Sequence, residues 1–305
     1  MKRTIFAFVV IVLLSTSACF QQEPKKSTIY LVDWDAPQVH EIWVGLERFN
    51  EGFTRDNWRA VLVDPEDLAG GDHVKLVIGH GSQASQVLQA ARNNPGQRYL
   101  LLDYDGEVPG NVIAVQFREE EKAFMAGIIA ALTSRTGTVG IAVSQASEYG
   151  FLAGVALANT QITVLVVPPG VGSGREAAYR LAEEGADVLY TTYLPWAEAF
   201  AAEALLHDLW LIGSAWGHKD FAPYNTLTVV ANDLAEAGLL VNRQLKEDRL
   251  TGNLSLGLAQ DCLTFLPLTS ASITSFLEEQ ILAVKSGMLK VPVNQEEFEE
   301  FMASH

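Results

Sequence analysis

The sequence contains a histidine between two glycines, and this polar feature could take part in chemistry. His80 and Ser82 follow the strand predicted over 75–78, whose residues after Lys75 are all apolar. Glycine lets the backbone turn sharply here, so that the amides of Gly81 and Ser82 could face a ligand beside the imidazole ring. We therefore predict His80, Gly81 and Ser82 as ligand contacts. A tight turn that carries an incidental histidine would produce the same pattern.

Carboxylates follow two further predicted strands. Asp33 and Asp35 come after the strand predicted over 29–32, and Asp103 comes after the one over 99–102. Ligands of open α/β sheets bind outside the carboxyl ends of the strands, so we predict Asp35 and Asp103 as ligand contacts. Asp33 and Asp35 could also pair as acid and base, although a solvated loop explains two neighbouring acids more simply.

Aromatic side chains gather at the predicted ends of strands as well. A flat ligand can stack on such rings, although each ring taken alone is more often part of the packing. Trp34 and Tyr149 lie at strand ends, and we predict direct ligand contacts for the three rings that follow later in the chain, Tyr193, Trp196 and Trp216.

The sequence lacks the common signatures of cofactor, metal and catalytic sites. The glycine-rich segment 170–175 has neither the spacing of a dinucleotide fingerprint nor the Gly-Lys-Ser/Thr of a P-loop, and a connecting loop explains it better. The 6 histidines form no metal-binding pair, and no Gly-x-Ser-x-Gly nucleophile motif is present. We therefore predict no cofactor, no metal site and no catalytic residue, in a protein that is not an enzyme.

Strand and helix patterns alternate along the chain, and this alternation must position the polar residues. Of the 305 residues, 49% are hydrophobic and 19% are charged, which is a globular composition with ample apolar material for a core. Alternating strands and helices predict an α/β fold with mostly parallel, doubly wound sheets. The length allows one large domain or two of ordinary size.

The net charge of -16 bears on the partners of the protein. With 37 acidic against 21 basic residues, the surface should repel phosphate backbones, which argues against a nucleic-acid partner. The charge alone does not identify a ligand.

The first nineteen residues have the layout of a signal peptide. Lys2 and Arg3 precede the apolar run 5–14, and small residues lead to Cys19. This pattern resembles a lipobox, in which the cysteine becomes the lipidated first residue, although Thr16 stands where leucine is usual. An ordinary cleaved signal with an incidental cysteine is the alternative. We predict lipidation of Cys19, a tether over 20–28, and a protein anchored in the cell membrane and facing outward from the cytoplasm.

Residues 111–141 carry a resemblance to a known family. Asn111-Val112, Phe117, Glu121, Phe124 and Gly127, followed by a Thr-Gly-x-Val-Gly strand, resemble the basic membrane protein (BMP) family of ABC-transporter substrate-binding lipoproteins, which includes purine-nucleoside receptors. The loop over 78–82 is similar to that of the Med-type branch. The resemblance covers roughly residues 29–293.

The resemblance implies two Rossmann-like lobes of the type I periplasmic-binding-protein kind. The first lobe would hold residues 28–134 and 233–250, and the second would hold 137–227 and 268–286. The chain would cross between the lobes near 135, 230 and 265. On the helix that leads out of the first lobe, we expect the side chains of Phe124 and Ile128 to be buried.

The motifs of nucleoside-binding relatives match this sequence only in part. Their Asp-x-Ser-Phe-Asn motif falls on 35–39, where Asp35 alone is kept. Their Ile-Gly-Val-Asp-x-Asp-Gln motif falls on 212–218 without either acid, and the lysine of Thr-Ser-x-x-Lys falls on Asn232. Loss of a carboxylate that accepts from two hydroxyls should weaken nucleoside binding strongly. We therefore expect a small polar or aromatic ligand in a remodelled site.

The resemblance implies an exported, membrane-anchored protein that captures a small molecule between two lobes for an ABC permease. The alternative is a Med-type regulatory or sensor lipoprotein that has the same fold and no cognate permease.

Overall fold

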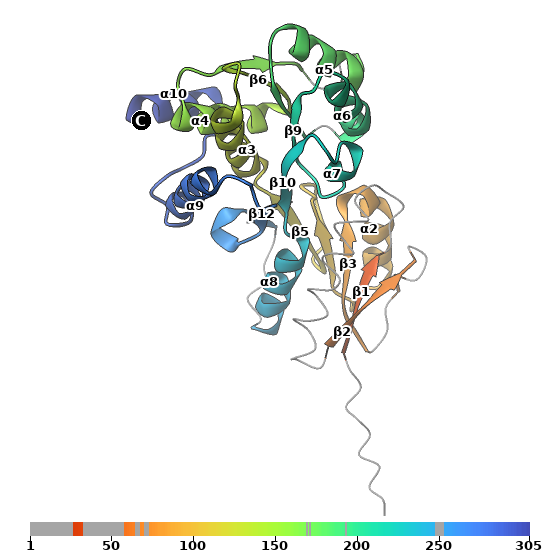
Figure 1. Ribbon diagram of the computed structural model, residues 1–305. Coiled ribbons are helices and arrows are strands. Elements are labelled where there is room, and N and C mark those ends of the chain that lie inside the picture. The colour runs from red at the N-terminus through yellow and green to blue at the C-terminus, as the bar shows by residue number, and fades with distance from the viewer. Residues whose placement is uncertain are drawn as a thin grey trace, which may run out of the picture.

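The computed structural model describes residues 27–32, 58–64, 68–69, 73–168, 170, 172–192, 194–247 and 253–305. Within this part of the chain the strands form two six-stranded sheets, one in each of two lobes (Figure 1). The predicted α/β class with mostly parallel sheets is confirmed. Cys19, Asp35 and Tyr193 lie outside the described residues.

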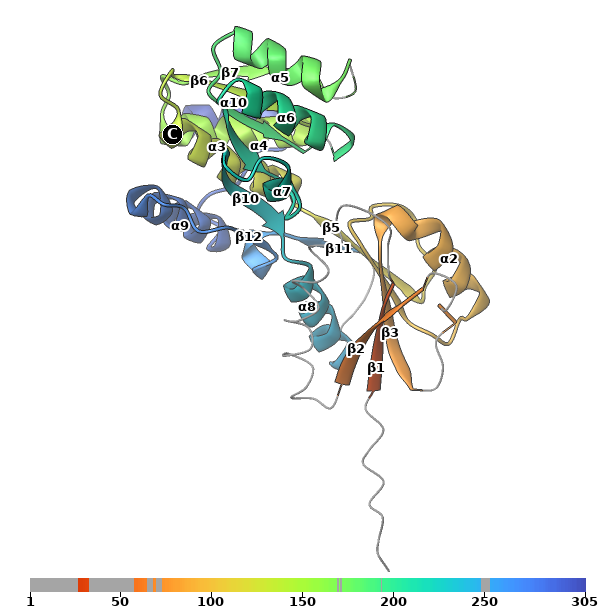
Figure 2. The same cartoon turned by 45° about the vertical axis from the view of Figure 1, so that its right-hand side comes forward.

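The first sheet is entirely parallel where its strands are described. In the order in which they pair, its strands are β2 (Trp58–Val63), β1 (Ser27–Val32), β3 (Val74–His80), β4 (Tyr99–Leu102), β5 (Val112–Phe117) and β11 (Leu254–Leu256). Helix α2 (Ala84–Asn93) lies on one side of this sheet and α8 (Leu234–Lys246) on the other (Figure 2).

The second sheet is parallel except for its last strand, which runs antiparallel to β10. Its order is β7 (Thr163–Val166), β6 (Thr138–Ala142), β8 (Val188–Thr191), β9 (Trp210–Gly213), β10 (Thr226–Asn232) and β12 (Leu263–Phe265). The helices that accompany it are α3 (Glu119–Thr133), α4 (Gln145–Ala158), α5 (Gly174–Glu183), α6 (Ala197–Leu206), α7 (His218–Phe221), α9 (Ala271–Lys285) and α10 (Gln295–Ser304), with the short 3-10 turns η2 (Leu194–Trp196) and η3 (Leu258–Gln260). The 3-10 turn η1 (Gly81–Gln83) belongs to the first lobe, where it joins β3 to α2.

Apolar residues on both faces of the second sheet explain why it is covered on both sides. In β8 the side chains of Val188 and Tyr190 belong to the core under α3 and α4, whereas Leu189 between them belongs to the core under α5 and α6. Successive residues of a strand point to opposite faces, so a continuous apolar run requires a layer of helices on each.

Helix α3 packs on the second lobe, which differs from the expected end of the first lobe at 134. Its neighbours are α4, β8, β10 and α9. Glycines allow this contact: a Cβ on Gly127 would lie 2.2 Å from the carbonyl oxygen of Phe151, and one on Gly154 would lie 2.2 Å from that of Phe124. The chain therefore leaves the first lobe directly after β5. The expected burial of Phe124 and Ile128 is confirmed, since both side chains are 0% exposed.

Hydrogen bonds join the segments that cross between the lobes. The Arg118 amide donates to the Leu256 carbonyl at 2.9 Å, and the Leu258 amide donates to Oε2 of Glu121 at 2.6 Å. The Asp233 amide donates to the Cys262 carbonyl at 2.8 Å. The three crossings thus lie side by side and hold the start of α3 between the two sheets.

Candidate functional site

The predicted contacts at the ends of β3 and β4 lie together. A Cβ on Gly81 would lie 2.1 Å from the carbonyl oxygen of Asp103, so only glycine fits where the two turns meet. Asp103 has a φ of 57°, a left-handed conformation that aspartate tolerates better than most residues. We call His80, Gly81, Ser82 and Asp103 the first-sheet cluster.

Both ring nitrogens of His80 have partners in this cluster. Nδ1 accepts a hydrogen bond from the Ser82 amide at 3.2 Å and lies 3.0 Å from the Ser82 hydroxyl. Nε2 lies 3.5 Å from Oδ2 of Asp103. Burial acts to raise the pKa of Asp103, but the hydrogen bond from His80 and the electrostatic interactions with His80 and Lys122 outweigh it, so that this pKa lies below its usual value.

A second histidine occupies the corresponding edge of the second sheet. His218 begins α7 and is 8% exposed. The Ser214 amide donates to its Nδ1 at 3.1 Å, and the Ser214 hydroxyl donates to the Thr191 carbonyl at 2.7 Å. Nε2 of His218 is buried and has no hydrogen-bond partner among the described residues. Burial and the positive charge of Lys122 lower the pKa of His218 from 6.5 to about 4.

Lys122 connects the two edges. It lies in the first turn of α3, is 5% exposed, and donates from Nζ to Oε1 of Glu119 at 2.8 Å. It also donates to Oδ1 of Asn232, the last residue of β10, at 3.3 Å. Because its charge lowers the pKa of Asp103 in one sheet and of His218 in the other, the ammonium acts on both edges. We call Lys122, Asn232, Ser214 and His218 the second-sheet cluster.

Tyr190, which precedes Thr191 on β8, carries a further buried hydroxyl. Its ring stacks on Phe151 with centroids 5.8 Å apart, and its buried hydroxyl has no hydrogen-bond partner among the described residues. Burial, reinforced by the negative charge of Glu119, raises the pKa of Tyr190 well above its usual value. The phenol therefore stays protonated at physiological pH.

The two predicted tryptophans that the structure describes have different surroundings. Trp196 is 6% exposed and belongs to the core with Phe200, under α5 and α6. Trp216 is partly buried in the turn between β9 and α7. Packing therefore accounts for Trp196, whereas Trp216 lies next to the second-sheet cluster; ligand contact by either remains a prediction.

Sequence reasoning did not identify Lys122 or Tyr190 as site residues. Lys122 belongs to a charged stretch that suits the start of a helix, and Tyr190 belongs to an apolar strand. The available signal was the lysine directly before the apolar run 123–132, because a helix that packs closely buries even its first turn.

The glycine-rich segment before α5 has a structural role. The Ser173 hydroxyl accepts from the Glu176 amide at 3.2 Å and caps the helix, and Arg175 pairs with Glu203 at 3.2 Å. These contacts account for its polar residues without a bound phosphate.

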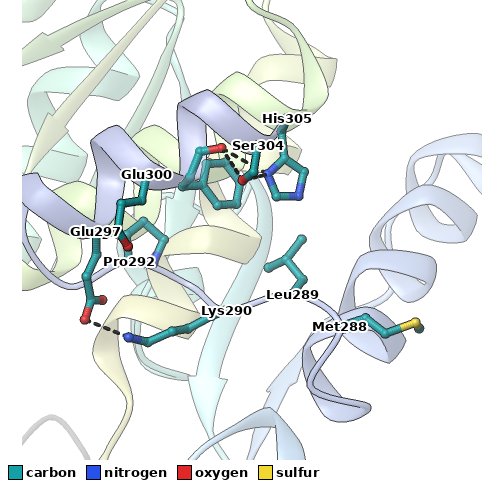
Figure 3. Close-up of a pocket in the computed structure, with 9 residues that line it drawn as sticks. Met288, Leu289, Lys290, Pro292, Glu297, Glu300, Ser304 and His305 are labelled. Atoms are coloured by element: carbon teal, nitrogen blue, oxygen red, sulfur yellow. Dashed lines mark hydrogen bonds and ion pairs between the residues drawn. The ribbon is translucent and has the colours of Figure 1, made fainter.

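A small pocket lies at the C-terminal end of the chain, away from both clusters. It has a volume of about 220 Å³, and Figure 3 shows the Lys290–Glu297 ion pair on one side of it and His305 on the other. Nζ of Lys290 donates to Oε1 of Glu297 at 2.7 Å, so the two charges satisfy each other. None of its lining residues comes from the end of a strand.

Two further features bear on the class of protein. Among the described residues, no group of three His, Cys, Asp or Glu side chains could hold a metal ion. In the same part of the chain no helix is long and apolar enough to cross a membrane.

Known proteins resemble this chain over most of its length. The family model described as "ABC transporter substrate-binding protein PnrA-like" (Bmp) matches residues 57–291. Basic membrane protein A of Borreliella burgdorferi is 29% identical over 79% of this chain and 77% of its own. Basic membrane protein A2 of Borrelia garinii is 27% identical over 97% of each chain.

Solved structures share the fold at lower identity. An ABC transporter solute-binding protein from Conexibacter woesei superposes with a TM-score of 0.69 and 17% identity, over 87% of this chain and 98% of the other. A transcriptional activator of the comK gene from Bacillus halodurans gives 0.70 and 19%, over 86% and 98%. The extent of the family match, together with the two-lobed fold, shows that this chain belongs to the Bmp family of PnrA-like ABC transporter substrate-binding proteins.

Proposed function

We propose that this protein captures a small molecule between the carboxyl edges of its two sheets. The supporting observation is that Lys122, which donates to Asn232 at the end of β10, lowers the pKa of Asp103 at one edge and of His218 at the other. A ligand placed among these groups would touch both lobes and would favour the closed arrangement by hinge closure. No catalytic step is part of the proposal.

The delivery role rests on the family and on the start of the sequence. We infer that Cys19 carries lipid, that the protein faces outward from the cell membrane, and that an ABC permease receives the ligand. One acyl chain binds a membrane only marginally, so firm anchoring requires the several chains of a bacterial lipoprotein. Cys19→Ser should move the protein from the membrane fraction to the soluble fraction. A wild-type protein that is already soluble would contradict the anchor.

The alternative partner is a regulatory one. The loop over 78–82 resembles the Med-type branch, whose members would have no cognate permease. Detergent extraction followed by affinity purification of the full chain distinguishes the transport role from the regulatory role. Co-purification of a permease and its ATPase supports transport, and their reproducible absence supports regulation.

Ligand capture is tested by thermal shift of the mature chain. Ligand binding stabilises the folded form by RT ln(1 + [L]/Kd), so a compound at 1 mM with a Kd of 10 μM adds about 2.7 kcal/mol. Adenosine and guanosine should give little or no shift, because the acids expected at 212–218 are absent. A rise of several degrees with either would contradict the remodelled site.

Asp103→Asn provides the matched test of the site. Asparagine tolerates a left-handed backbone as aspartate does, so the change removes charge and keeps the turn. A compound that shifts the wild type should shift this variant less, whereas the exposed control Glu299→Gln should respond as the wild type does. Equal responses of both variants would place the ligand elsewhere.

A further inference from the structure

We propose that Nε2 of His218 donates a hydrogen bond to an uncharged acceptor of the ligand, such as a carbonyl oxygen or a ring nitrogen, and so helps to set specificity. The inference rests on the proposed ligand capture and adds the chemistry by which one residue recognises its ligand.

The backbone fixes which nitrogen of His218 carries the proton. The Ser214 amide donates to Nδ1 at 3.1 Å, so Nδ1 must present a lone pair. A neutral imidazole carries one proton, which then resides on Nε2. His218 is therefore a donor of fixed direction at the edge of the second sheet.

That donor lacks an acceptor among the residues that the structure describes. Nε2 is buried and has no hydrogen-bond partner among the described residues, while the residue is 8% exposed. A buried donor without a partner costs free energy, and native proteins rarely leave one unless something else completes it. A ligand acceptor would complete this one.

The neighbouring charges favour an uncharged ligand group over an anion. Lys122 is the buried cation at this edge, and its Nζ is already 2.8 Å from Oε1 of Glu119. Asp103 and Asp233 add negative charge, and Asp233 is 7% exposed. A phosphate or carboxylate on the ligand would be repelled by these acids, and the buried lysine of the described residues at this edge is already paired with Glu119.

His218 also remains neutral over the physiological range, since burial and the charge of Lys122 lower its pKa to about 4. It therefore offers a hydrogen bond and no positive charge to the ligand. Its ring lies 5.8 Å from that of Phe221, which supports the orientation of the imidazole.

Two substitutions separate the donor from the structural role of the ring. In His218→Asn the side-chain oxygen stands near the position of Nδ1 and keeps an acceptor for Ser214, but the outer donor is lost. In His218→Gln an amide donor reaches toward the position of Nε2. Loss of one hydrogen bond that leaves a buried acceptor unpaired should weaken binding about tenfold or more in the asparagine variant and less in the glutamine variant.

The test uses the full chain with ¹⁵N-labelled histidine and three matched pairs of probes: uridine and uridine 5′-monophosphate, nicotinamide and nicotinate, and ribose and ribose 5-phosphate. The expected result is an Nε2-protonated His218 without ligand. At least one uncharged probe should move that Nε2 resonance and raise the melting temperature, and its anionic counterpart should bind at least tenfold more weakly.

The melting temperature tests ligand capture, and the Nε2 resonance tests the role of His218. A probe that raises the melting temperature without moving the Nε2 resonance overturns the role of His218 and leaves ligand capture standing. An Nδ1-protonated ring, tighter binding of the anionic probes, equal affinities of wild type and His218→Asn, or a panel that never moves the resonance each overturns the inference.

Discussion

The two histidines at the sheet edges differ in what the protein provides for them. His80 has a partner at each ring nitrogen, from Ser82 and from Asp103. His218 has a partner at Nδ1 and none at Nε2 among the described residues. In the first-sheet cluster the protein supplies partners for both ring nitrogens of the histidine. In the second-sheet cluster the Nε2 donor of His218 has no partner among the described residues. An orphaned donor is a better indication of a binding site than a histidine in a glycine turn, which is the more conspicuous sequence feature.

The largest expected effect comes from breaking the α3–α4 packing that positions Lys122 in the second-sheet cluster. Phe124 is 0% exposed, so Phe124→Ala should lower the free energy of unfolding by about 3–5 kcal/mol. Urea denaturation measures it, with Leu282→Ala as a control because that leucine is 63% exposed. A loss below about 1 kcal/mol for Phe124→Ala would show that α3 is peripheral.

Acid titration should separate the second cluster from the first. His218 has a pKa of about 4 when folded against 6.5 for the free side chain, so the unfolded chain takes up its proton first as the pH falls. Stability contributed by neutral His218 is therefore present above pH 6.5 and declines toward pH 4, by about 3 kcal/mol.

The measurement is the difference in unfolding free energy between wild type and His218→Asn at each pH. This difference should shrink by about 3 kcal/mol between pH 6.5 and pH 4. A difference that stays constant with pH would show that His218 titrates normally. Asp103 has a lowered pKa, so its contribution is lost only at lower pH, below its usual value of 3.8.

Lys122→Met should change the pKa of one side chain in each cluster. The ammonium lowers the pKa of Asp103 and of His218, so its removal should raise both. NMR titration of the two side chains measures this change. A shift at His218 without one at Asp103 would show that Lys122 acts on the second sheet alone.

The smallest effect is expected from Asp103→Asn at neutral pH. The Asp103 side chain is 43% exposed and its contact to His80 is 3.5 Å long. Solvent screening limits such a pair, so the loss of stability should stay below about 1 kcal/mol. Thermal or urea unfolding without ligand measures it, and a larger loss would show that the first-sheet cluster supports the fold rather than a ligand.

Strand ends and close helix packing were predictable because they depend on neighbouring residues in the sequence. The strand over 75–78 followed by glycines predicted the turn at His80, and Phe124 and Ile128 on α3 were predicted to be buried. Asp103 and His80 were both placed at the same edge because parallel strands end together.

The identity of the buried cation was not predictable, because it depends on contacts distant in sequence. Lys122 is buried through glycines in α4, about 30 residues later in the chain, and through Asn232. The same contacts move α3 to the second lobe, against the expected boundary at 134. Trp196 illustrates a related limit, since a strand-end pattern does not determine which side chains turn into the core.

The glycine contacts between α3 and α4 have a consequence for how closure could be observed. They make Lys122 travel with the second lobe, while Asp103 stays with the first. A change in the angle between the lobes alters the distance from the ammonium to that carboxylate, and hence its acidity. The pKa of Asp103 is therefore expected to change with the angle between the lobes, and NMR can follow that change without an added label.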